Sequence, residues 1–237
     1  MHIRDSRVTS HLNRAKECIE KAERYYSEIE MTSGVQDLSA SQHMPVGTDI
    51  RSYLSDHQYD RLRKSILKSF RLDIEQFKTL YPLILYNLIL TSILSNDLDE
   101  IMDFHLFRHA KNQGKHMHYL ESQCDQIGLF HRIPIDYQIR SLRQLGRQPA
   151  KAKRQLWSLL EDYSRGRTRQ LYQKSKRQLG KMRHLLLYQR NIHMAQTIAE
   201  DLSEKSGFVG VGAAHLYGYQ GILRILKYSG FKIQPLS

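Results

Sequence analysis

Apolar residues recur every three or four positions near the start of the chain, which predicts a helix over residues 5–26. Val8, Leu12 and Ala15 follow this spacing, and charged residues lie between them. The pattern changes over residues 24–30, where tyrosine and isoleucine become frequent. This composition predicts that the helix is followed directly by a strand.

The middle of the chain has a mainly helical pattern, over about residues 49–103 and 135–203. Between these two regions, residues 116–121 predict a second short strand. The most apolar run covers residues 80–94, about fifteen positions, whereas a membrane-spanning helix needs about 20. We therefore expect this run to form a buried helix, with Pro82 near its first turn.

The end of the chain has a different pattern. Residues 207–212 are apolar and rich in glycine, which is typical of a buried parallel strand. A helix is expected over residues 221–230 and a last strand over residues 231–235, so the three elements predict a βαβ unit. The sequence thus indicates a helix-rich α/β fold, with a small, mostly parallel or mixed central sheet surrounded by many helices, in a single domain over residues 1–237.

The chain is basic, with 36 Lys+Arg against 24 Asp+Glu and a net charge of +12. The excess lies entirely within residues 140–183, where 14 basic residues accompany only Glu161 and Asp162. Interspersed aromatic residues would suit single-stranded nucleic acid, but the charges lie all round the helical patterns and match no known recognition motif. We therefore expect a solvated helical face, or one that meets an anionic membrane surface, rather than a nucleic-acid partner.

Two histidines have the sequence context of a site. His215 follows the predicted buried strand, and ligands of open α/β sheets bind just beyond the carboxyl ends of strands. His2 also leads straight into a helix, so a strand before it would bring it beside His215. Glu28 or Glu30 would complete a set that suits Zn²⁺, Mn²⁺ or Co²⁺. The alternative is a histidine that caps a strand and two ordinary surface glutamates.

Other side chains are weaker candidates. His105 and His109 lie one helical turn apart, a metal-binding spacing, but without the glutamate of H-E-x-x-H. We favour a polar helix face for this pair. Tyr217, beside His215, could donate a hydrogen bond to a substrate or an oxyanion, or else form an aromatic lid or core contact. The two cysteines have no C-x-x-C spacing, which excludes a zinc ribbon or a disulfide-rich class.

Several short motifs in order resemble those of the TraB/GumN family. Residues 208–221 read F-V-G-V-G-A-A-H-L-Y-G-Y-Q-G, similar to the family's closing strand, G-x-x-H-L and spaced glycines, and a leucine-rich helix and a final proline follow. The opening M-H-I-R-D-S and the later S-E-I-E of residues 27–30 resemble its first half. The remaining matches are Met102-Asp103 to an L-D signature, Gly114-Lys115 to G-K, residues 119–122 to L-E-T and Arg190-Asn191 to an R-N helix start. The similarity is colinear over nearly the whole chain.

This resemblance implies a metal-dependent hydrolase, with peptide cleavage as the best-supported activity, in a group that includes the TIKI, erythromycin-esterase-like and ChaN-like proteins. It implies His2, His215 and Glu28 as ligands of a divalent metal ion such as Mn²⁺, Co²⁺ or Zn²⁺. The further site residues carried over or expected beside them are Glu28, Asp103, Glu121 and Arg190 as catalytic residues, and Asn191, Gly212 and Tyr217 as substrate-binding residues. The expected partner is a peptide or small-molecule substrate.

The first G-x-x-H of the family needs a glycine two residues before Met1. We therefore expect either a misassigned start or a truncated chain, with the first strand of the family outside the given sequence. As the sequence stands we expect a cytoplasmic protein, whereas an upstream signal or lipoprotein peptide would place it in the bacterial cell envelope.

The sequence therefore leaves two functions open. The first is a metal-dependent peptidase with a two-histidine plus carboxylate site. The second is a noncatalytic binding protein with a degenerate site and a basic helical face that binds anions or nucleic acid.

Overall fold

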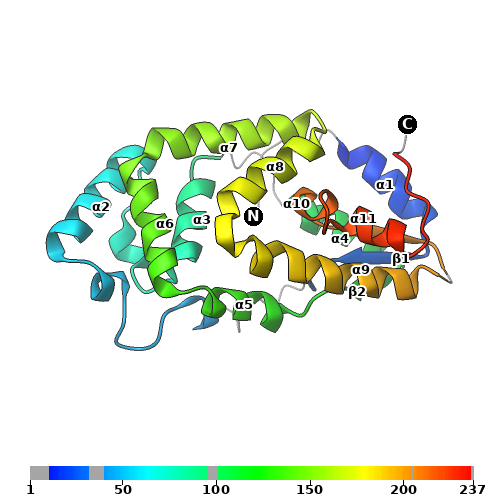
Figure 1. Cartoon of the computed structure of the whole chain (residues 1–237), viewed down its shortest axis with the longest axis horizontal. Coiled ribbons are helices and arrows are strands. Elements are labelled where there is room, and N and C mark those ends of the chain that lie inside the picture. Colours follow the sequence, from blue (N-terminus) through cyan, green and yellow to red (C-terminus); the bar gives the residue numbers. More distant parts are fainter. Residues whose placement is uncertain (1–10, 32–39, 95–100, 204, 236–237) are drawn as a thin grey trace. The chain divides into compact units, whose positions relative to one another are not determined.

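The computed structural model describes residues 11–31, 40–94, 101–203 and 205–235 (Figure 1). These residues form two compact units, one drawn from residues 32–97 and 126–158, the other from residues 6–31, 98–125 and 159–237. Two of the boundaries between the units fall within helices, α5 (Gln123–Arg132) and α7 (Pro149–Ser164).

The described part of the first unit is helical. Its elements are α2 (Asp56–Phe70), α3 (Pro82–Thr91), α6 (Ile135–Arg147) and the 3₁₀ turns η3 (Ala40–Gln42), η4 (Ile50–Tyr53) and η5 (Ile74–Phe77). Helices α2 and α6 approach closely at Gly146, where a Cβ atom would lie 2.4 Å from Leu62 Cδ1. The apolar run of residues 80–94 forms the buried helix that its pattern predicts, because Leu85 and Ile89 are fully buried. Among the described residues, no helix combines the length and the apolarity that crossing a membrane requires.

The second unit contains a three-stranded parallel sheet. The strands are β1 (Arg24–Ser27), β2 (His116–Tyr119) and β3 (Gly207–Gly210), in the order β2-β1-β3. The helices of this unit are α1 (Leu12–Lys21), α4 (Met102–Asn112), α8 (Thr168–Leu179), α9 (Gln189–Asp201), α10 (Ala213–Leu216) and α11 (Ile222–Tyr228), with a 3₁₀ turn η6 (Gly180–Met182) and a π-helical turn η7 (His184–Tyr188). The prediction of a helix-rich α/β fold with a small parallel sheet is confirmed.

Helices cover both faces of this sheet. Tyr25 is fully buried on one face, among α1, α4 and Phe208. Tyr26 is fully buried on the other face, among α9, α11 and Val209. Successive strand residues point to opposite faces, so the Tyr25-Tyr26 pair of β1 anchors both layers. The sheet is therefore the middle layer of an α/β/α arrangement within this unit (Figure 1).

The predicted last strand, residues 231–235, is wrong: the structure gives this segment no strand. The amide of Phe231 instead donates to Leu226 O (3.1 Å) and closes the end of α11, while its side chain packs against the Tyr26 side of the core. Pro235 has no N–H for a sheet ladder. Strand β3 pairs instead with β1, far away in the sequence, so the βαβ unit predicted for residues 207–235 does not form.

Candidate functional site

The polar site lies at the carboxyl ends of the three parallel strands. Glu28 follows β1, the central strand, and lies between the two neighbouring strands. Its backbone carbonyl accepts from Glu121 N (2.8 Å), just beyond β2, and its Oε1 accepts from Gly212 N (2.6 Å), just beyond β3. All three strands therefore bring a polar group to one edge, the position at which α/β sheets bind ligands.

Arg190, in the first turn of α9, joins two of these groups. Its Nη2 donates to Glu28 Oε2 (3.0 Å) and to Glu121 Oε2 (2.6 Å), and its Nε donates to Glu121 Oε1 (2.8 Å). Nη1 donates to the carbonyl of Leu186 (3.3 Å), in the π-helical turn η7. The guanidinium therefore joins the carboxylate of Glu121 to the Leu186 carbonyl. All three nitrogens of the Arg190 guanidinium thus donate hydrogen bonds to acceptors of the protein.

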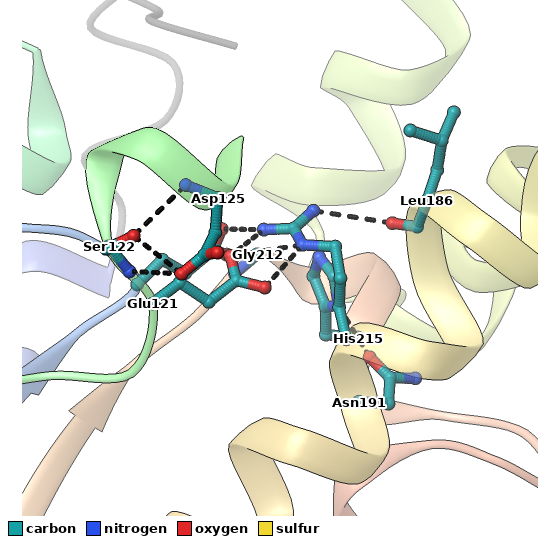
Figure 2. Close-up of polar contacts among 9 residues, drawn as sticks. Glu121, Ser122, Asp125, Leu186, Asn191, Gly212 and His215 are labelled. Carbon is teal, nitrogen blue, oxygen red and sulfur yellow. Dashed lines mark hydrogen bonds and ion pairs between the residues drawn. The ribbon is translucent and has the colours of Figure 1, made fainter. Parts of the chain in front are cut away.

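The position of Glu121 is fixed by the residues that follow it. Ser122 Oγ accepts from Asp125 N (3.0 Å) and donates to Asp125 Oδ2 (2.6 Å), while Ser122 N donates to the same oxygen (3.2 Å) (Figure 2). This reciprocal pairing caps the start of α5. Glu121 directly precedes this cap, and its side chain is buried beside Arg190.

Hydrogen bonds determine which nitrogen of His215 carries the proton. Asn191 is fully buried, and its Nδ2 donates to the carbonyl of Gln220 (2.6 Å), which can only accept. Asn191 Oδ1 must then face His215 Nδ1, 2.6 Å away, and an amide oxygen can only accept (Figure 2). Nδ1 is therefore the protonated nitrogen, and in the neutral ring Nε2 holds the free lone pair.

Electrostatics leave both central groups deprotonated at neutral pH, one negatively charged and one neutral. Burial favours a higher pKa for Glu28, but the charges of protonated His215 and Arg190 and the Gly212 N–H outweigh it and lower the pKa. Burial lowers the pKa of His215 below 6.5, against the opposing charge of Glu28, and Arg190 lowers it further. At neutral pH the site thus holds an ionised Glu28 beside a neutral His215.

Gly212 allows the Glu28 carboxylate and the His215 ring to lie close together. A Cβ atom at this position would lie 3.2 Å from Glu28 Oε1 and 3.5 Å from His215 Cδ2. Any larger side chain would push between the carboxylate and the imidazole. The glycine also donates its amide to Glu28, so its role in this structure is to hold the carboxylate.

Comparison with known proteins identifies the family. The sequence model of the TraB/PrgY/gumN family matches residues 1–235. The chain belongs to the TraB/PrgY/gumN family. The match covers residues of both compact units. A search of curated proteins and a search of solved structures each found no match.

The structure brings most of the predicted site residues of this TraB/PrgY/gumN protein together. Glu28, Glu121, Arg190 and Gly212 are linked by hydrogen bonds, and His215 lies against Gly212. His2, expected as a metal ligand, lies outside the described residues. Asn191, expected to contact substrate, is fully buried and holds His215 instead.

Two further predicted residues lie near this cluster. Asp103 is the second residue of α4; loss of hydration raises the pKa of its carboxyl, and the charge of Glu28 adds to this effect. Burial and, as the smaller cause, the charge of Asp103 raise the pKa of Tyr163 to about 12. Tyr217 directly follows α10 and is exposed, as a substrate contact requires. Outside this cluster, His109 Nε2 lies 3.3 Å from Glu20 Oε1.

A divalent metal ion, implied by the TraB/GumN resemblance, has suitable donors here. His215 presents Nε2 while Nδ1–H is bonded to Asn191, the arrangement usual for a metal-binding histidine. Each oxygen of Glu28 keeps a second lone pair beyond its present hydrogen bond. Within the described residues no group of three His, Cys, Asp or Glu side chains forms a metal site, so a complete set needs a ligand such as His2.

Some contacts of the site left little trace in the sequence. The Leu186 and Gln220 carbonyls bind Arg190 and Asn191 through the backbone, which any side chain permits. Tyr172 packs against Gly218, where a Cβ atom would lie 2.2 Å from the tyrosine hydroxyl. The Ser122-x-x-Asp125 spacing did carry a helix-cap signal.

Replacing Arg190 tests the ion-pair network. Arg190→Met leaves two mostly buried carboxylates without a counter-charge and is expected to destabilise the protein by about 3–5 kcal/mol at pH 7 in urea unfolding. In the wild type the lowered pKa of Glu28 stabilises the fold above about pH 4.3, and this contribution is lost as pH falls through the folded-state pKa. In Arg190→Met the two carboxylates without a counter-charge favour protonation. The difference in the free energy of unfolding between wild type and variant should therefore become smaller as the pH is lowered.

The matched control is Arg165→Met, which removes an exposed partner of Glu161 and should cost less than about 1 kcal/mol. Equal urea midpoints for Arg190→Met and wild type at pH 7 would show that the network does not stabilise the fold.

Replacing Asn191 tests how the His215 ring is fixed. Asn191→Asp keeps an acceptor for Nδ1–H, whereas Asn191→Ala removes it. The ¹⁵N NMR signals of His215, recorded at about pH 9 where histidine is neutral, should show the Nδ1–H tautomer in wild type and in the Asp variant. The Ala variant should show the Nε2–H tautomer in addition.

Gln220→Ala is the control, because Asn191 contacts only the backbone carbonyl of this residue. An unchanged Nδ1–H tautomer in Asn191→Ala would mean that another contact fixes the ring.

Proposed function

We propose that this protein is a metal-dependent hydrolase that cleaves peptide bonds at the carboxyl edge of its sheet. The observation that carries the proposal is the pairing of a neutral His215, with its lone pair on Nε2, and an ionised Glu28 on either side of Gly212. A free imidazole lone pair beside a carboxylate suits metal-assisted hydrolysis. The peptide class rests on the resemblance to the TraB/GumN family.

His215 Nε2 and Glu28 would hold the metal ion, with His2 as the third ligand that the family pattern implies. When bound, such an ion lowers the pKa of its water and polarises the substrate carbonyl. Asn191 keeps the His215 ring from turning, so the lone pair of Nε2 stays directed at one place. Preorganisation of this kind avoids reorientation at the moment of reaction.

Arg190 has a supporting role in this proposal. The resemblance implies Arg190 as a catalytic residue, but its three nitrogens donate to Glu28, Glu121 and the Leu186 carbonyl. Its charge therefore holds the two carboxylates in place and keeps Glu28 ionised. Tyr217, exposed beside the site, is our candidate to donate a hydrogen bond to the substrate carbonyl oxygen.

The overall reaction balances without any further reactant. The oxygen of water forms a bond to the carbonyl carbon, the C–N bond breaks, and the leaving amine receives a proton that came from the water. The acid and the amine are the two products. The chain's contribution is to orient the carbonyl and hold an ionised carboxylate beside it.

The test is hydrolysis of an internally quenched peptide library by the wild type with Mn²⁺, Co²⁺ or Zn²⁺, and with EDTA. We expect cleavage that needs the metal and falls at least about 100-fold in His215→Ala. Bound metal, measured by mass spectrometry after dialysis, should also fall in this variant. His193→Ala, an exposed histidine on α9, is the control and should change neither quantity.

Equal metal content in wild type and His215→Ala would contradict the ligand assignment. If the wild type binds the metal ions but cleaves no peptide in the library, the noncatalytic binding protein becomes the better account.

A further inference from the structure

An exposed cluster of two tyrosines and an arginine lies on the segment that follows His215. Tyr219 and Tyr228 expose 74% and 70% of their surface. The Arg224 guanidinium lies over both rings, 5.1 Å from the centroid of Tyr219 and 5.4 Å from that of Tyr228. We refer to these three residues as the tyrosine–arginine surface.

Contacts within this surface hold its side chains in place. Arg224 Nε and Nη2 both donate to the hydroxyl of Tyr228, at 3.1 and 2.8 Å, one turn along α11. An arginine fixed in this way has less rotamer freedom left to lose when a ligand binds. Tyrosine rings offer a large contact area at low entropic cost. The side chains of this surface would therefore lose little freedom on binding a ligand.

The loop that carries Tyr219 is also fixed. Gly218 has φ +102°, and a Cβ atom there would lie 2.2 Å from the Tyr172 hydroxyl. Asn191 holds the Gln220 carbonyl at 2.6 Å, and the other end of the same amide holds His215. One buried side chain therefore connects the tyrosine–arginine surface with the proposed catalytic histidine.

The segment that carries this surface has charged side chains of positive sign only. From residue 207 to residue 235 the sequence contains Arg224, Lys227 and Lys232 and no Asp or Glu. All three cationic residues are exposed. A ligand with negative charge complements them, and a ring or a proline stacks well on tyrosine.

We propose that the tyrosine–arginine surface binds a segment of the peptide substrate that carries acidic residues and an aromatic side chain. The assignment rests on the proposed hydrolase, because it makes this surface a substrate-recognition site of the same centre. A membrane surface is the competing partner. We favour the peptide because tyrosine rings bonded to a polar guanidinium are better suited to stacking on a ligand than to insertion among acyl chains. The hydrogen bonds of Asn191, which connect this surface to His215, also favour a ligand of the same site.

The experiment measures peptide binding in the His215→Ala variant, so that no peptide is consumed. Fluorescence anisotropy compares a labelled peptide containing Glu-Phe-Glu with one of equal length containing Lys-Ala-Lys. We expect the acidic aromatic peptide to bind at least about tenfold more tightly, and this preference to be lost in Tyr219→Ala and Arg224→Ala. Arg224→Lys keeps the charge without the planar stack, and should lose most of the preference. Tyr53→Ala, an exposed tyrosine of the first unit, should leave binding unchanged.

Equal binding of the two peptides, or full retention of the preference in Tyr219→Ala, would overturn the assignment. So would loss of binding to phosphatidylserine vesicles in the same variants with peptide binding intact, since the surface would then contact membranes. If the peptide binds as expected but the wild type cleaves nothing, the hydrolase proposal fails while the binding surface stands.

Discussion

The hydrogen bonds of Glu28 are the constraint on which the rest of the site depends. Its residue continues the central strand, its carbonyl receives the Glu121 amide from one neighbouring strand, and its carboxylate receives the Gly212 amide from the other. A parallel sheet of three short strands has little ladder of its own, so these added bonds extend the pairing beyond the strand ends. The same bonds place Glu121 and the start of α10 at the carboxyl edge of the sheet. Because His215 is part of α10, it lies at this edge as well.

The charge at this edge of the sheet is set by one guanidinium, that of Arg190, which is shared between two carboxylates. Arg190 neutralises only part of the negative charge of Glu28 and Glu121, and it is held by both and by the Leu186 carbonyl. Its positive charge and the burial of His215 keep that imidazole neutral, since both disfavour imidazolium. The site therefore combines an ionised carboxylate with a neutral histidine, the combination on which the proposed metal-dependent hydrolysis rests.

Sequence reasoning predicted the parts of this molecule that depend on local pattern. The tyrosine-rich segment at Tyr25 and the glycine-rich segment before His215 form β1 and β3, because each pattern meets the demands of a buried strand. Residues 231–235 also have a strand-like pattern but no strand beside them to pair with among the described residues, and local pattern cannot supply a partner. The overall fold class was therefore predictable, and the pairing of the strands was not.

The site was predictable at the level of residue types and only partly at the level of roles. The resemblance selected Glu28, Arg190 and Asn191, yet nothing in the sequence says that Asn191 is buried against His215 or that the nitrogens of Arg190 donate to two carboxylates and a carbonyl. Apart from the Leu186 carbonyl, four positions from Arg190, those roles depend on contacts between residues 24 to 162 positions apart. Such contacts are set by packing in three dimensions, and they turn an expected substrate contact into a support for the histidine.

The central claim is that Glu28 and His215 act as one unit, and a double-mutant cycle on peptide hydrolysis tests it most directly. Rates would be compared for the wild type, Glu28→Gln, His215→Ala and the double variant. Residues that act together lose their effect together, so the double variant should be no more than about twofold slower than the slower single variant. If the double variant is instead slower by the product of the two single fold-decreases in rate, as expected for independent sites, the account is contradicted.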